Sequence, residues 1–214
     1  MTSKNNILLL TLFSTLLACV TFQSATAQGN STRRAGIKGG LNVSNLFVDN
    51  VSDENARLGY NVGIFGELVS SESFALQAEL LFSTKGSTNQ YGSPFNQEIK
   101  YNLNYIDLPL LAVFKLGAVD FHLGGYASYL VGSTIAYKGD FINGVDQIDK
   151  DNLKSFDYGL VGGLAVNFGA LQVGARYNYG LVKIADSNAA EVLIGDSKNS
   201  VAQLYLAINL NSKR

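Results

Sequence analysis

The chain has 214 residues and a net charge of −1, and only 15% of its residues are charged against 47% that are apolar. Soluble enzymes carry about 25% charged residues, and a chain without a positive field does not attract nucleic acid. There are 22 glycines, 11 tyrosines and 12 phenylalanines. This composition favours a sheet with an apolar outer surface and small or polar residues inside, and it excludes nucleic acid as a partner.

Residues 1–27 are predicted to be a secretory signal peptide. A short positive region precedes an apolar core at residues 7–20, and an A-x-A cleavage pattern ends at Ala27. The core is shorter than the roughly 20 residues of a membrane-spanning helix. Two alternatives stay open, a retained anchor and lipid attachment at Cys19. Cys19 is the only cysteine, so its removal with the signal would exclude disulfides and thiolate metal sites from the domain at residues 28–214.

The pattern that persists after the signal is an alternation of period two, which is typical of strands with two different faces. No later apolar run is long enough to cross a bilayer as a helix. Residues 171–183 and 199–210 alternate in this way, and residues 74–85 show it most clearly. In that stretch one face is apolar, while the opposite face carries Gln77, Glu79, Ser83 and Lys85.

Eight such segments are predicted, and each reaches the 9–11 residues of a tilted membrane strand. Short turns alternate with long polar connections, as in outer-membrane barrels, whose termini and short turns face the periplasm. The sequence therefore predicts an all-β, eight-stranded antiparallel transmembrane up-and-down β-barrel in the cell outer membrane. The predicted strands are 34–47, 57–70, 73–86, 98–117, 119–133, 153–168, 170–184 and 199–210. The long connections are 48–56, 87–97, 134–152 and 185–198, and the short ones are 70–72, 117–118 and 168–169.

A soluble barrel of the lipocalin type is the competing interpretation, because it also has eight strands and follows a signal peptide. In a soluble barrel the apolar residues point inward. Here one face is almost wholly apolar and the other carries charges in mid-strand, which favours a membrane barrel with a polar interior. Four positive and four negative residues are predicted to form a structural charge network in the lumen: Lys38, Glu67, Glu79, Lys85, Asp107, Lys115, Asp157 and Arg176.

Four stretches of the chain resemble the PorT-like outer-membrane β-barrel family, and together they span nearly all of residues 28–214. The resemblance implies an eight-stranded, OmpA-like barrel in the outer membrane of a Gram-negative bacterium. The family's namesake is associated with assembly of a protein-secretion system, and most members have no assigned activity. Leu210 stands where such barrels usually place the aromatic residue recognised by the barrel insertion machinery. The stretches are residues 36–46, 74–86, 103–111 and 174–181.

Catalytic chemistry has little support in the sequence. His122 is the only histidine, so an imidazole-rich metal site is excluded and any Ser-His-acid triad must use it. Ser128 shares its face, but the two are roughly 20 Å apart along the strand, too far for direct activation. A serine from another strand is the remaining alternative. We expect a lumen residue near the rim, no enzyme activity and no cofactor or catalytic site.

The interior charges are expected to pair, because an unpaired charge in a closed barrel is costly. Glu79 with Arg176, or with Lys38, is the predicted buried ion pair. Such pairs act either as a plug that fixes the fold or as a gate that opens when the pairs exchange. An interior of eight strands is only wide enough for its own side chains or one small ligand, which favours the plug.

Two further motifs are weaker. The glycines of residues 159–163 are not a phosphate loop, since no Lys-Ser/Thr follows them; they favour strand bending or space in the lumen. In the long polar connection, the carboxylates of Asp146, Asp149 and Asp151 have three possible roles: they bind a calcium ion, they bind lipid phosphates through bridging cations, or they are simply solvated in an exposed loop.

The sequence therefore predicts a non-enzymatic barrel with a structural or interaction role and a lumen plugged by side chains. Its predicted partners are outer-membrane lipid, the barrel insertion machinery and proteins that meet its loops or periplasmic turns. Three other functions stay open: a narrow channel for ions or small solutes, an accessory of a secretion system, and a membrane hydrolase that depends on His122.

Overall fold

The computed structural model describes residues 33–47, 55–91, 97–139, 144–147, 154–183 and 198–211. The predicted signal peptide at residues 1–27, including Cys19, lies outside these ranges. A search of the described residues finds no helix with the length and hydropathy needed to span a membrane.

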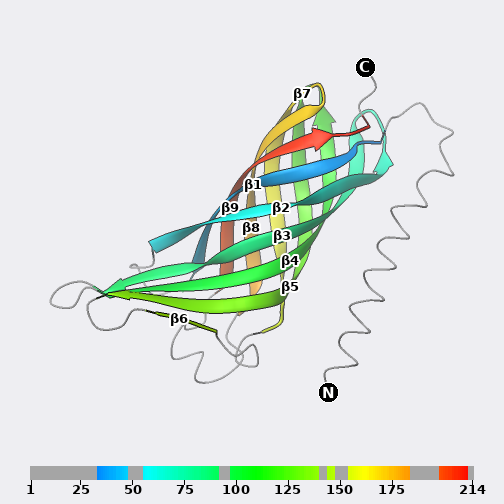
Figure 1. Cartoon of the computed structure of the whole chain (residues 1–214). Helices are drawn as coiled ribbons and strands as arrows, with labels where there is room; N and C mark the ends of the chain where they lie inside the picture. The colour runs from blue at the N-terminus through cyan, green and yellow to red at the C-terminus, as the bar shows by residue number, and fades with distance from the viewer. Residues whose placement is uncertain are drawn as a thin grey trace. The chain divides into compact units, whose positions relative to one another are not determined.

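The described chain forms nine antiparallel strands, and eight of them close into a barrel (Figure 1). The first strand of the chain pairs with the last, for example at Ile37 and Ile208, and this pairing closes the sheet. The predicted fold class is therefore confirmed. The strands are β1 (Ala35–Phe47), β2 (Asn55–Ser70), β3 (Phe74–Tyr91), β4 (Gln97–Leu116), β5 (Val119–Gly139), β6 (Gly144–Gln147), β7 (Phe156–Phe168), β8 (Leu171–Lys183) and β9 (Lys198–Asn209).

Residues alternate between buried and exposed along the barrel strands, as the period of two predicts. On β9, Gln203 and Tyr205 are 2% and 3% exposed, whereas Leu204 between them is 65% exposed. Polar and charged side chains therefore line the interior, and leucines, valines and phenylalanines form the outer surface. This is the reverse of a soluble barrel, and it suits lipid as the solvent of the outer surface.

Two of the predicted loops have wrong bounds, because strands continue into them; residues 92–96, 140–143 and 148–152 of these loops lie outside the described residues. Residues 87–97 were expected to form a loop, but β3 runs to Tyr91 and β4 begins at Gln97. Residues 134–152 were expected to form another, but β5 runs to Gly139 and the short strand β6 pairs with it. Polar residues in these stretches do not mark the end of a strand, since backbone pairing with a neighbour satisfies the main-chain groups whatever the side chains are.

A bulge at Val131 marks the change from barrel wall to extended sheet. Asn104 pairs with Gly132 and Tyr105 with Leu130, so Val131 is an extra residue in β5. The bulge reverses the buried face, because Leu130 is buried before it and Ser133 after it. The pairing of β5 with β7 ends nearby, at Tyr129 and Phe156.

Glycine is required at the short turns of the barrel. Gly117 between β4 and β5 and Gly169 between β7 and β8 have φ angles of 63° and 64°. A side chain is strained in this left-handed region, so glycine permits two of the three short turns that the sequence predicts.

Candidate functional site: the charged interior

All eight charged residues predicted for the lumen lie on the inward face of the barrel. Seven of them are at most 4% exposed, and the eighth, Lys115, has a side chain that is 14% exposed. Their hydrogen bonds and ion pairs divide them into three layers along the barrel. We name these the turn layer, nearest the short turns, the central layer, and the loop layer, toward the long connections.

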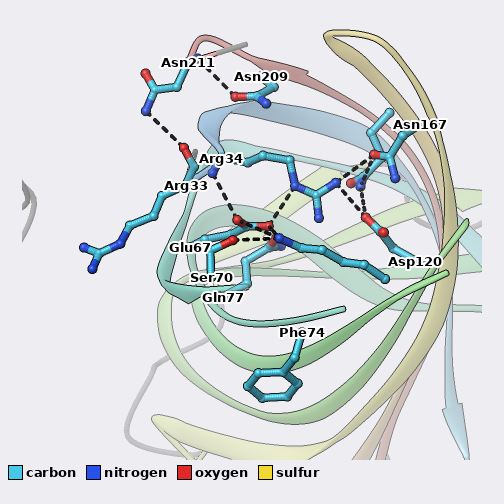
Figure 2. Close-up of polar contacts among 12 residues, drawn as sticks. Arg33, Arg34, Glu67, Ser70, Phe74, Gln77, Asp120, Asn167, Asn209 and Asn211 are labelled. Carbon is cyan, nitrogen blue, oxygen red and sulfur yellow. Dashed lines mark hydrogen bonds and ion pairs between the residues drawn. The ribbon is translucent and has the colours of Figure 1, made fainter. Parts of the chain in front are cut away.

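The turn layer is built around Arg34, which immediately precedes β1 (Figure 2). The Arg34 guanidinium donates to Glu67 through Nε at 2.7 Å and pairs with Asp120 through NH1 at 2.8 Å. Lys115 Nζ lies 3.1 Å from the Glu67 carboxylate and 2.7 Å from Ser70 Oγ. The Asp120 carboxylate also accepts a hydrogen bond from Gln172 at 3.1 Å.

The central layer is a single carboxylate held by two cations. Arg176 donates to both oxygens of Glu79, at 2.7 and 2.8 Å, and Lys38 Nζ lies 3.2 Å from them. Gln77 adds a hydrogen bond to Glu79 at 2.7 Å. The prediction offered Arg176 or Lys38 as the partner of Glu79, and the structure brings both to it.

The Tyr205 ring packs against both cations of the central layer. Its ring centroid is 3.5 Å from Lys38 Nζ and 5.3 Å from Arg176 Cζ, within the range of cation–π attraction. The ring occupies space left by Gly174, where a Cβ would lie 2.4 Å from the Tyr205 Cζ atom. Gly174 therefore makes room for the Tyr205 ring, which packs against Lys38 and Arg176.

The loop layer joins Lys85 and Asp107, 2.9 Å apart. Ser128 bridges them, with its hydroxyl 2.5 Å from Asp107 and 3.2 Å from Lys85 Nζ. Asp157 belongs to the same layer through uncharged partners, since it accepts hydrogen bonds from the Tyr126 hydroxyl at 3.1 Å and from Asn199 at 2.8 Å.

Two of the ion pairs join opposite walls of the barrel. Around the closed sheet, β3 and β8 are four strands apart in either direction, and so are β1 and β5. The Glu79–Arg176 pair joins β3 to β8, and the pair of Asp120 with Arg34 joins β5 to the start of β1. Side chains therefore cross the lumen at two levels.

Sequence reasoning missed Arg34 and Asp120. Both follow the alternation that identified the other charges, since Arg34 is four residues before Lys38 and Asp120 is two before His122. Arg34 immediately precedes β1 and Asp120 is the second residue of β5, and a polar residue at the start of a strand is easily assigned to a turn. With them, the three layers contain five cations and five carboxylates, and this balance suits a closed interior.

The structure does not assemble a catalytic triad from His122 and Ser128. His122 is buried as predicted, but its Nδ1 lies 3.4 Å from the Tyr205 hydroxyl. The Ser128 hydroxyl contacts Asp107 and Lys85 in another layer. Within the described ranges no three His, Cys, Asp or Glu side chains are grouped to hold a metal ion.

The weaker motifs have simpler structural roles. The glycines of residues 159–163 lie inside β7, as their interpretation as strand residues predicted. Asp146 lies in β6, and Asp149 and Asp151 lie outside the described residues.

Aromatic side chains mark the two edges of the outer apolar surface. Four of the exposed phenylalanines lie beside the short turns, including Phe168 at the end of β7, whereas the exposed tyrosines and Phe156 lie toward the long connections, including Tyr158 on the same strand. The ten steps from Tyr158 to Phe168 correspond to a height of about 25 Å for a strand tilted by about 40°, which matches the apolar band of outer-membrane barrels. The other phenylalanines of the turn side are Phe74, Phe114 and Phe121, and the other tyrosines of the loop side are Tyr60, Tyr177 and Tyr179.

Comparison with solved structures finds small outer-membrane proteins. The chain is similar to Ail, the attachment invasion locus protein of Yersinia pestis, whose structure was solved in complex with the heparin analogue sucrose octasulfate. The two sequences are 15% identical, the match covers 83% of this chain and 99% of that chain, and the TM-score is 0.47. It is also similar to Neisserial surface protein A, with 12% identity, 86% and 100% coverage and a TM-score of 0.46.

No curated protein matches the chain. The family model described as "Outer membrane protein beta-barrel domain" matches residues 23–186. The chain therefore belongs to this family of outer-membrane β-barrels, and its place is the cell outer membrane.

Proposed function

We propose that this protein is a non-enzymatic membrane anchor that holds an extended sheet outside the bilayer, where the sheet binds a protein partner. The short turns face the periplasm and the long connections face the cell exterior, as in other barrels of this kind. The interior serves to hold the anchor rigid and closed.

The observation that carries the interaction role is the unequal length of the strands. β3, β4 and β5 have 18, 20 and 21 residues, whereas β7 and β8 have 13 each. The excess of five to eight residues extends the sheet by roughly 15 Å beyond β7 and β8 at the usual rise and tilt, and β2, with 16 residues, is intermediate. In Figure 1 these three strands continue past the barrel, and β6 lies beside β5, with which it pairs in the sheet.

An extended sheet of this kind offers backbone groups and side chains to a partner. A sheet edge binds a partner strand through main-chain hydrogen bonds, and its side chains give specificity. Bilayer anchoring alone needs strands of only 9–11 residues, so the additional length of β3–β5 supports a role in water beyond the membrane.

The experiment is affinity capture from outer membranes with a shortened hairpin. Asn89 pairs with Ile99, so replacing residues 89–99 by an Asn-Gly turn shortens β3 and β4 in register. As a control, the connection at residues 185–196 is shortened instead. We expect a protein captured by the wild type and the control to be lost from the hairpin variant. Equal capture by the hairpin variant would overturn the interaction role.

A closed lumen is the second part of the proposal. The Glu79–Arg176 and Arg34–Asp120 pairs cross the interior at two levels, and this supports a plug over the narrow channel that is its alternative. Single-channel recording on the purified protein separates the two functions, because only a channel gives steady openings.

The resemblance to PorT-like proteins supports a more specific role as an accessory of a protein-secretion system in a Gram-negative bacterium. This role is compatible with the extended sheet, which would contact the secretion machinery. A deletion strain with reduced secretion of exported proteins, restored by the wild type and not by the shortened hairpin, is the expected result. Unaltered secretion in the deletion strain would eliminate this role and leave the anchor itself untouched.

The non-enzymatic part of the proposal rests on the separate surroundings of His122 and Ser128. Each has its own partner in a different layer, so a hydrolase would have no activated nucleophile there. Any hydrolytic activity of the purified protein that disappears in His122→Ala, with the barrel still folded, would contradict this part.

A further inference from the structure

The loop layer contains two buried carboxylates and one cation that binds to only one of them. Lys85 Nζ lies 2.9 Å from Asp107. Asp157 is 3% exposed, and the hydrogen bonds to its Oδ2 come from the neutral side chains of Tyr126 and Asn199. One lysine against two carboxylates leaves this layer with a surplus negative charge, and a buried charge without a partner is costly.

Oxygen atoms without partners gather around Asp157. Asp157 Oδ1 has no hydrogen-bond donor within the described part of the chain, and neither has Asn199 Oδ1, whose amide nitrogen donates to Asp157 Oδ2 at 2.8 Å. The Tyr105 side chain is completely buried. Its hydroxyl lies beside Asn199 and within electrostatic reach of Asp157, without the geometry of a hydrogen bond to either. A carboxylate, an amide and a phenol oxygen therefore lie in one part of the lumen with unused lone pairs.

These oxygens come from different walls of the barrel. Tyr105 is on β4 and Asn199 is on β9, which are four strands apart around the closed sheet in either direction. Gly180 on β8 leaves room where the groups meet, because a Cβ there would lie 2.8 Å from the Asn199 backbone oxygen and 3.2 Å from the Tyr126 hydroxyl. The oxygens therefore converge across the lumen rather than line one strand.

We propose that Asp157, Asn199 and Tyr105 bind a monovalent metal cation, sodium or potassium, at the loop end of the lumen. Hard cations take carboxylate and carbonyl oxygens as ligands, and one positive charge balances the surplus carboxylate. The central layer does not supply this charge, because both of its cations are held against its own carboxylate.

A monovalent cation fits the site better than water or calcium. A water molecule would supply hydrogen bonds and leave the charge of Asp157 uncompensated. Calcium would reverse the charge of the layer, and it takes roughly six to eight oxygen ligands. The loop layer is also the layer nearest the long connections, so a cation reaches it from the cell exterior in the proposed orientation.

The test is unfolding by urea in lipid vesicles, with sodium chloride exchanged for N-methylglucamine chloride at constant ionic strength. Because the ion binds only the folded barrel, each tenfold rise in sodium above its dissociation constant should lower the unfolding equilibrium constant about tenfold. The constant ionic strength keeps the screening of exposed charges the same, so the change reports binding of the ion.

Two variants locate the site. Asp157→Asn removes the carboxylate charge and should abolish the sodium dependence. Tyr105→Phe removes a hydroxyl that has no partner among the described residues. It should therefore unfold like the wild type without sodium, and it should need about tenfold more sodium for the same stabilisation, since one ligand is lost.

Asp120→Asn is the matched control, because it removes another buried carboxylate, the one that pairs with Arg34 in the turn layer. It should lower the stability in both salts and keep the sodium dependence. Heat-modifiable migration on a gel establishes that each variant folds. The proposal is overturned if the wild type unfolds identically in the two salts, if Asp157→Asn keeps the dependence, or if Asp120→Asn loses it.

Thallium(I), which substitutes for monovalent metal cations, gives a direct reading that needs no variant. Anomalous scattering beside Asp157 Oδ1 in crystals soaked with thallium(I) acetate is the expected result, and scattering only at other places would also overturn the site. A failure here would leave the extended sheet and the closed lumen untouched, because hairpin shortening and single-channel recording test them separately.

Discussion

The central layer and the turn layer use the same kinds of residue in different surroundings. In the central layer, the side chains of Arg176 and Glu79 are both 0% exposed. In the turn layer, the Arg34 side chain is 19% exposed and that of Lys115 is 14% exposed. Water and salt therefore reach the cations of the turn layer and not those of the central layer, although the carboxylates of Glu67 and Asp120 are as buried as that of Glu79. Ion pairs with similar geometry in the two layers should therefore differ in how much free energy of unfolding the barrel loses when one partner is removed.

The largest expected effect is that of Glu79→Gln. This change leaves Arg176 and Lys38 buried together without a carboxylate, and removing one partner of a buried pair typically destabilises a protein by about 3–5 kcal/mol. Unfolding by urea in lipid vesicles measures the free energy difference from the wild type. A loss below about 1 kcal/mol, the range of surface pairs, would show that the central layer is not sealed from water.

A matched pair of arginine substitutions tests the difference between the central layer and the turn layer most directly. Arg176→Gln should lose about 3 kcal/mol, because Glu79 keeps only Lys38 and Gln77 in a buried site. Arg34→Gln should lose less, about 1 kcal/mol, because the guanidinium that is removed is itself partly solvated and Glu67 keeps Lys115 at 3.1 Å. Added salt should shrink the Arg34 effect and leave the Arg176 effect unchanged. Equal losses in both variants would remove the distinction between the two layers.

Gly174→Ala tests whether the packing of Tyr205 against the two central-layer cations stabilises the barrel. The new methyl group would lie 2.4 Å from a Tyr205 ring carbon, so the ring must shift from its position against Lys38 and Arg176. Such overpacking typically destabilises by about 1–3 kcal/mol, and the same urea titration measures it. Gly162→Ala, on β7, is the control, since nothing lies within 4 Å of the added carbon. If the two variants unfold at the same urea concentration, Tyr205 does not support the central layer.

The smallest expected effect is that of Lys115→Gln in the turn layer. Glu67 keeps its pair with Arg34 at 2.7 Å, and the lysine is partly solvated, so a loss below about 1 kcal/mol is expected. A larger loss would mean that the turn layer depends on both cations.

The sequence could predict the barrel strands because their signal is local. Alternation identified the eight wall strands to within a few residues at the ends nearest the short turns. It failed at 87–97 and 134–152, where polar residues interrupt the apolar alternation although strands continue into both stretches. It also missed β6, whose four residues are too few to show a period.

The partners inside the lumen depend on geometry that no local pattern contains. Glu79 and Arg176 are 97 residues apart, and their heights match only because of the stagger between successive strands. The stagger of a closed barrel is a property of the whole sheet. Sequence reasoning could therefore place both residues inside and propose that they pair, but it could not show that Lys38 joins them or that Arg34 reaches across to Asp120.

The central claim is that side chains crossing the barrel close its lumen, and planar-bilayer recording of the purified wild-type protein tests it most directly. The Glu79–Arg176 and Arg34–Asp120 pairs predict no steady openings at any applied voltage that the bilayer withstands. Steady openings of uniform conductance in the wild type would contradict the claim and identify the protein as a narrow channel.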